Sequence, residues 1–149
     1  MKIITITIED TEFVTLHLTQ KLMTFNEPIP DFGTRYPGKL ESCLAMPFGQ
    51  FDDQDIYQGL VKKAAILFYL MIQNHPFLNG NKRIALTTLL NFLYLNKKWL
   101  KTSQEKMYDF VISVAKSKLE EKDLILKQIQ NFIKSHLIDL EQHLPHPNS

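Results

Sequence analysis

Most of the chemically useful side chains of this sequence fall in one stretch of nine residues, "HPFLNGNKR", which begins at His75. A histidine can take a proton from a hydroxyl group, because an imidazole changes its charge near neutral pH. Lys82 and Arg83 are cations of the kind that hold phosphate oxygens. The Asn-Gly pair ahead of them is typical of a tight turn. Taken one at a time, each feature is also explained by ordinary structure.

The stretch joins two long apolar segments. Apolar residues recur at helical spacing on both sides of it, which predicts two helices with little solvent-exposed surface. The first helix is expected to begin with Asp52 or Asp53 as its N-cap and to reach about Asn74. The second is expected to run from about Asn81 to Leu95. The chemically useful residues therefore lie in a turn between two buried helices.

This turn has the features of an anion site. The first N–H groups of the second helix have no partner within the helix, and its dipole favours negative charge there. Asn79 and Gly80 both tolerate positive φ, so that successive amides can converge on an anion. Two cations, Lys82 and Arg83, suit a polyphosphate better than a single carboxylate. With His75 beside them, these residues indicate phosphoryl or nucleotidyl transfer.

The N-terminal third predicts one strand, one helix and a long loop. "KIITITI", from Lys2, alternates isoleucine and threonine like a short strand. Helical spacing follows over residues 11–24. Residues 26–50 contain four prolines and three glycines, which predicts a loop with a short helix at 39–45. A loop of this length in a compact domain is often functional.

The C-terminal third predicts two more helices. "TSQE" at 102–105 and "SKLE" at 117–120 both have the spacing of a capping box. They predict helices over about 103–116 and 118–140. Strand content is minimal, so the fold class is all-α.

Composition places few limits on function. The length of 149 residues predicts a single domain over residues 1–140, followed by a disordered tail at 141–149. A net charge of +1 gives no reason to expect nucleic acid or a membrane as a partner. The longest apolar run has nine residues, too few to span a bilayer. With Cys43 as the only cysteine and no signal peptide, we expect a cytoplasmic protein.

"HPFLNGNKR" resembles the signature of the Fic/Doc family, which is roughly His-x-Phe-x-Asp/Glu-Gly/Ala-Asn-x-Arg. The similarity to Doc-type (death-on-curing) members extends over about residues 10–115. It implies a compact helical domain with a short N-terminal strand and a flap loop near the active site. It also implies that His75 is the catalytic base, and that ATP phosphates are held by Gly80, Asn81, Lys82 and Arg83.

Lys82 bears on the reaction type that the resemblance implies. Fic-type adenylyltransferases usually carry glycine at this position, whereas Doc-type proteins carry lysine, which is associated with a reversed ATP and transfer of the γ-phosphate. The resemblance thus implies a protein kinase that modifies a Ser, Thr or Tyr hydroxyl of a target such as elongation factor Tu. Protein adenylylation (AMPylation) in the same fold is the alternative.

One position departs from the family signature. The acidic residue that binds Mg²⁺ in the family falls on Asn79, and an amide carbonyl can coordinate Mg²⁺ but brings no charge. Metal affinity should fall, so a second alternative is a nucleotide-binding pseudoenzyme that acts by binding a partner.

The family also uses a flap to align its target, and residues 30–48 are the candidate here. Arg35, Tyr36 and Lys39 could contact a target or a phosphate there, although an ordinary surface loop explains the composition equally well. "SKLEEK", from Ser117, matches the family's self-inhibitory helix poorly. We therefore expect an antitoxin that acts in trans.

Overall fold

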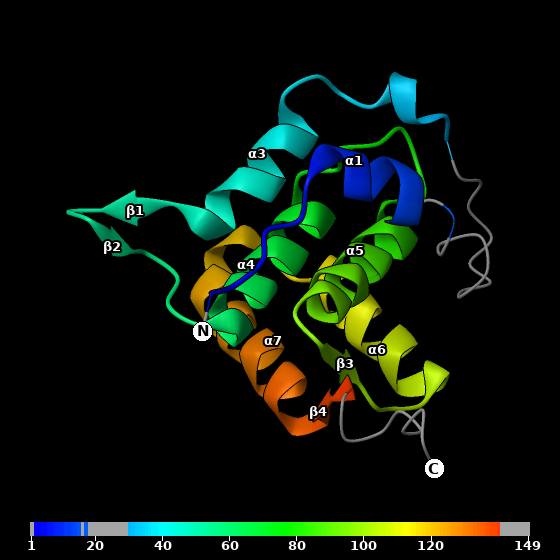
Figure 1. Ribbon diagram of the computed structural model, residues 1–149. Coiled ribbons are helices and arrows are strands. Elements are labelled where there is room, and N and C mark those ends of the chain that lie inside the picture. The colour runs from blue at the N-terminus through cyan, green and yellow to red at the C-terminus, as the bar shows by residue number, and fades with distance from the viewer. Residues whose placement is uncertain (1, 16, 18–29, 141–149) are drawn as a thin grey trace, which may run out of the picture.

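Two buried helices form the centre of the protein, in a computed structural model that describes residues 2–15, 17 and 30–140 (Figure 1). They are α4 (Leu60–Gln73) and α5 (Asn81–Leu95), and they pack against each other. Almost every side chain of α4 from Lys63 onward is buried. Such helices gain their stability from packing more than from intrinsic propensity.

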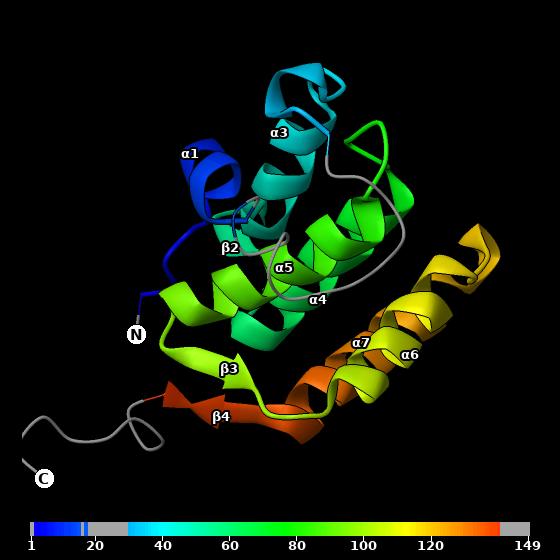
Figure 2. The same cartoon turned by 90° about the vertical axis from the view of Figure 1, so that its right-hand side faces the viewer.

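The helices form three layers, which Figure 2 shows from the side. On one side of the central pair lie α1 (Ile8–Asp10), which continues as a π-helical turn to Thr15, and α3 (Lys39–Ala45). On the other side lie α6 (Gln104–Ala115) and α7 (Lys122–His136), with α7 packed directly on α4. The all-α fold class is confirmed.

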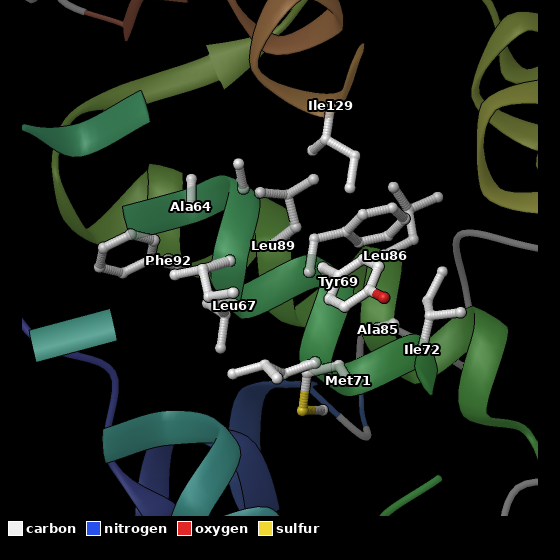
Figure 3. Packing of buried hydrophobic residues seen from close by; sticks show 14 of the residues in the cluster. Ala64, Leu67, Tyr69, Met71, Ile72, Ala85, Leu86, Leu89, Phe92 and Ile129 are labelled. Atoms are coloured by element: carbon white, nitrogen blue, oxygen red, sulfur yellow. The ribbon is translucent and has the colours of Figure 1, made fainter. Parts of the chain in front are cut away.

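The core surrounds the central helices and reaches from α3 on one side to α7 on the other. Figure 3 shows Leu67 of α4 near Leu89 of α5, with Ile129 pointing in from α7 and Met71 of α4 on the opposite side of the cluster. Each of these side chains is at most 1% exposed. Full burial of an aliphatic side chain of this size contributes about 1.5–3 kcal/mol. Both ends of the turn that joins α4 to α5 are thereby fixed.

The extended N-terminus is not a strand, and that prediction was wrong. Residues 2–7 pair with no other strand, because the side chain of Asn96 takes the place of one. The Ile4 N–H donates to Asn96 Oδ1 (2.7 Å), and Asn96 Nδ2 donates to the carbonyls of Ile4 (3.0 Å) and Phe92 (2.9 Å). A buried amide thus satisfies both backbone groups that a neighbouring strand would have satisfied.

The predicted start of α4 was also wrong. Asp52 and Asp53 cap no helix. They form the two-residue turn of a hairpin, β1 (Gln50–Phe51) with β2 (Gln54–Asp55), and both have positive φ (53° and 62°). Such values are those of a type I′ turn, which matches the twist of paired strands. The helix begins only after Gly59, whose φ is 85°.

The hairpin projects from the body of the molecule and is anchored at its base (Figure 1). Lys63, which is 3% exposed, forms an ion pair with Asp55 (Nζ–Oδ2, 2.9 Å) and donates to the Tyr57 carbonyl. A buried ammonium needs such partners. Lys63 holds the pKa of the Asp55 carboxyl below its usual range.

The last predicted helix was wrong at both ends. Ser117 caps no helix: a 3₁₀ turn (Leu119–Glu121) precedes α7, and the Lys118 N–H donates to Glu121 Oε1 (3.0 Å). The chain leaves α7 at His136 and forms β4 (Leu137–Asp139), antiparallel to β3 (Lys98–Leu100). Pairing with β3 gives these backbone groups partners that a longer helix would have provided internally.

The other predicted elements fared better. The helix at 39–45 and the one from Asn81 to Leu95 are confirmed, and α6 is confirmed with Ser103 as the cap, its Oγ accepting from the Lys106 N–H (3.1 Å). The helix expected at 11–24 begins earlier, at Ile8, and its remainder lies outside the described residues, as does the predicted tail. Within the described ranges, no helix is both long and apolar enough to cross a membrane.

Replacing Asn96 by alanine should destabilise the fold, because the Ile4 N–H and carbonyl lose the side chain that holds them and the Phe92 carbonyl loses a donor. Three hydrogen bonds are removed, so we expect the free energy of unfolding to fall by about 2–4 kcal/mol. Urea denaturation followed by circular dichroism measures the change. Asn131→Ala, an exposed asparagine on α7, is the matched control and should change it by less than about 0.5 kcal/mol. Equal effects of the two substitutions would contradict this role for Asn96.

Candidate active site

In the turn between α4 and α5, His75 is exposed to solvent and Phe77 is buried in the core. Helix α4 ends at Gln73 with Asn74 as its C-cap, and His75 follows with a left-handed backbone (φ 47°), which redirects the chain. His75 is exposed, whereas Phe77 is 1% exposed in the core. Gly80 is left-handed as well (φ 72°) and precedes the first residue of α5, while Asn79 has no positive φ. Positive φ is unusual outside glycine, and it falls here on the proposed base.

Asn81 closes this turn. Its Oδ1 accepts from the Phe77 N–H (3.0 Å), and its Nδ2 donates to the Phe77 carbonyl (2.9 Å). Both ends of the side-chain amide are thus used within the protein, and the residue is 9% exposed. The Asn81 side chain therefore shapes the turn, and its role in binding a phosphate stays a prediction.

His75 borders two pockets. One, of about 320 Å³, lies toward the first turn of α5, and we call it the α5 pocket. It is lined by Ile72, Gln73, His75, Leu78, Asn79, Asn81, Lys82 and Ala115. The other, of about 550 Å³, lies toward residues 30–48, and we call it the flap pocket. It is lined by Pro37, Gly38, Lys39, Ser42, Gln73, Asn74 and His75.

The flap, residues 30–48, is docked on the His75 turn. The Tyr36 N–H donates to the Pro76 carbonyl (2.9 Å), and the rings of Phe32 and Phe77 lie 6.2 Å apart. Both segments lie at the same end of the molecule (Figures 1 and 2). The flap therefore reaches the site through two contacts with the residues next to His75.

The three predicted flap residues have different surroundings. Arg35 forms an ion pair with Glu41 (Nη2–Oε1, 3.0 Å), and its guanidinium lies 4.3 Å from the centre of the Phe32 ring. A backbone hydrogen bond at Glu41, followed by the contact with Arg35, lowers the pKa of the Glu41 carboxyl. Lys39 lines the flap pocket and lies over the Tyr36 ring (4.9 Å). Only Lys39 of the three shares a pocket with His75.

The predicted phosphate-binding residues are also divided. Lys82 and Asn81 line the α5 pocket with His75, so the structure brings these three together. Arg83 lies in the same turn of α5 but is only 8% exposed and lines neither pocket. Gly80 is the N-cap residue and makes no side-chain cap.

The α5 pocket does not fit a protein-held Mg²⁺ ion. Asn79 is exposed at its rim and offers a neutral carbonyl, and no carboxylate lines either pocket. In the described part of the chain, no three His, Cys, Asp or Glu side chains gather as metal ligands. Mg²⁺ is bound in proteins mainly through carboxylates and substrate phosphates. The loss of metal affinity that Asn79 predicts stays a prediction.

Sequence reasoning missed Gln73, which borders both pockets. Its Nε2 donates to the Val114 carbonyl (3.1 Å) and to Ser117 Oγ (3.2 Å), so it ties the end of α4 to the turn after α6. A signal was present in the sequence: this glutamine directly follows the nine-residue run "AAILFYLMI" and precedes Asn74 and His75.

The Fic/Doc family is the class that this fold and site define. The model of the Fic/DOC family matches residues 8–93, more than half of the chain, and the chain therefore belongs to this family. A curated relative, the toxin Doc of Mycolicibacterium smegmatis, is 36% identical over 59 residues. These residues are 40% of this chain and 45% of the relative, so the match spans less than half of that protein. The predicted family and its Doc-type branch are confirmed. A comparison with solved structures gave no significant match.

Cys43 lies behind the flap pocket and should be inert in the folded protein. It is fully buried next to Asn74 (Nδ2–Sγ, 3.8 Å), and burial raises the pKa of its thiol to about 11. Because alkylation needs the thiolate, the thiol at pH 8 should react with iodoacetamide at least about a hundredfold more slowly than in the unfolded chain. Mass spectrometry measures the two rates. Equal rates in buffer and in denaturant would contradict the buried position.

Proposed function

We propose that this protein transfers the γ-phosphate of ATP to a hydroxyl group of a protein target. The observation that carries the proposal is the position of His75 on the boundary between two pockets, with the cation of Lys82 in one of them. One pocket suits phosphates, and the other leaves room for a target next to the flap. Membership of the Fic/Doc family supports a protein-modifying transferase.

The residues of the site would act in one sequence. His75 takes the proton of the target hydroxyl, and the hydroxyl oxygen attacks the γ-phosphorus. The bond from this phosphorus to the bridging oxygen breaks, and ADP leaves. Lys82 and the amides at the start of α5 neutralise charge on the phosphates during the transfer. Because the pocket does not fit a protein-held Mg²⁺, we assign no step to a metal.

Lys82 supports γ-phosphoryl transfer over adenylylation. Its side chain lines the pocket that the start of α5 forms, so its ammonium occupies part of the space a triphosphate would need along the amides. The reversed ATP of Doc-type members, with its γ-phosphate near the histidine, avoids that space. Adenylylation of a protein is the alternative if ATP binds in the other direction.

Asn79 favours a second candidate function. Without a carboxylate in either pocket, the protein could bind a nucleotide and act on a partner without catalysis. The pseudoenzyme would transfer no part of ATP to a protein, whereas the kinase would transfer the γ-phosphate.

The proposed biological role is that of a Doc-like toxin in the cytoplasm, whose target is a translation factor such as elongation factor Tu. The relative of M. smegmatis, which is named a toxin, supports this role. We also propose an antitoxin in trans. Glu121, which an inhibitory helix would direct to the nucleotide, instead accepts from the Lys118 N–H at the start of the 3₁₀ turn.

Incubation with bacterial lysate and ATP labelled separately at the α and γ positions tests the proposal. Label on a protein from the γ position alone supports the kinase. Label from the α position means adenylylation, and no label with ATP still bound supports the pseudoenzyme. Either of the last two results would overturn the proposal.

Replacing His75 by alanine should abolish transfer but leave ATP binding intact. A general base contributes about 10²–10⁴-fold to the rate, and His75 is exposed, so its loss should not unfold the protein. Transfer is measured with γ-labelled ATP, and ATP affinity by calorimetry. His17→Ala, which changes another exposed histidine outside both pockets, is the control and should keep full activity. Near-normal transfer by the His75 variant would remove it from the mechanism.

Replacing Lys82 by glycine should change which phosphate is transferred. Without the ammonium, the amides at the start of α5 become open to the other direction of ATP, so we expect γ-phosphoryl transfer to be lost and AMP addition to appear. Mass spectrometry of the modified target separates the two products. Lys82→Arg, which keeps the cation, is the control and should add phosphate only.

The same pair should be compared in an Asn79→Asp background, which restores the carboxylate of the family signature. Activity should rise there if metal binding was limiting. Addition of AMP by the unmodified protein would contradict the orientation argument.

A further inference from the structure

The flap pocket has one cation and no carboxylate among the residues that line it. Lys39 supplies the cation, and Ser42, Gln73 and Asn74 supply neutral polar groups. Both sides of the pocket are fixed: Lys39 begins α3, and its N–H donates to the Tyr36 carbonyl (3.2 Å), while Gln73 and Asn74 end α4. The pocket is therefore a formed, positively charged hollow next to His75.

Lys39 and Arg35 differ in whether their charge is already neutralised. Arg35 is held by Glu41 through two hydrogen bonds, from Nε (3.2 Å) and Nη2 (3.0 Å). Lys39 forms no ion pair with any carboxylate of the described residues, and its ammonium lies over the face of the Tyr36 ring. An ammonium on an aromatic face keeps its charge available to a third group. Lys39 is thus the flap cation that can bind a target.

The position of His75 decides which part of a target would enter this pocket. The proposed transfer needs the phosphates on one side of the imidazole and the acceptor hydroxyl on the other, roughly in line. Lys82 and the start of α5 take the phosphates in the α5 pocket, so the acceptor approaches from the flap pocket. Residues beside the acceptor in the target sequence then lie against Lys39.

We propose that the flap pocket selects a target whose acceptor hydroxyl stands next to an acidic side chain, and that Lys39 binds this carboxylate. Ser42 on the α3 side of the pocket, and the side-chain oxygens of Gln73 and Asn74 on the α4 side, offer hydrogen-bonding groups to the peptide backbone. The inference rests on the proposed function, because it places the acceptor beside His75. Under this inference Lys39 determines which target is selected, whereas Arg35 only stabilises the flap.

Peptide binding to the full chain tests this directly. The probes are three fluorescent peptides with a central threonine flanked by aspartate, alanine or lysine, and anisotropy is measured with a non-hydrolysable ATP analogue present. The aspartate peptide should bind about five- to tenfold more tightly than the alanine peptide, and the lysine peptide should be weakest. Lys39→Glu should reverse this order. Lys62→Glu changes an exposed lysine outside both pockets and should leave the order unchanged.

Three results would overturn the inference: equal affinity for the three peptides, no measurable binding of any of them, or the same order of affinities in the Lys39→Glu variant. Calorimetry with ATP supplies a fourth, because a loss of ATP affinity in that variant would assign Lys39 to the nucleotide. Label transfer in the lysate reports separately on the proposed function. A preference for the aspartate peptide with no label from γ-labelled ATP would uphold the pocket and reject the kinase.

Discussion

The paired hydrogen bonds between the Asn81 amide and the Phe77 peptide are the constraint on which the site depends. They fix the residue that is buried, Phe77, relative to the first turn of α5. With Phe77 held in the core, the left-handed residues on either side, His75 and Gly80, have little freedom in where they send the chain. The side-chain amide of Asn81 thus places both the imidazole of His75 and the start of α5.

The position of the flap depends on the same turn. It meets the turn through a backbone hydrogen bond to Pro76 and a ring contact with Phe77, so its position follows from theirs. Gln73, which lines both pockets, ties the end of α4 to the end of α6. The flap and the His75 turn are therefore both positioned on one buried phenylalanine, and α6 is joined to them through Gln73. Rigid support of this kind is what a site that works by positioning requires.

The sequence allowed the central helices and the turn between them to be predicted, because burial leaves a periodic pattern and the signature residues are contiguous. Predictions of secondary structure from the local sequence pattern were wrong where a residue distant in the sequence determines the structure. "KIITITI" has the alternation of a strand, but Asn96, far along the chain, replaces the neighbouring strand. Asp52 and Asp53 are good helix caps by type, yet the buried Lys63 draws Asp55 into a hairpin base. The contrast between Arg35 and Lys39 likewise depends on Glu41 being within reach, which spacing alone does not reveal.

The β1–β2 hairpin has a practical consequence for handling this protein. Its turn, Asp52–Asp53, stands clear of the body, whereas its attachment is confined to the base at Lys63, Asp55 and Tyr57. Exposed tips of this kind are where foreign sequence is best accepted. An affinity tag or a fluorescent protein inserted between the two aspartates would therefore leave the core and the His75 turn unchanged. The protein could then be captured or followed without altering either end of its chain.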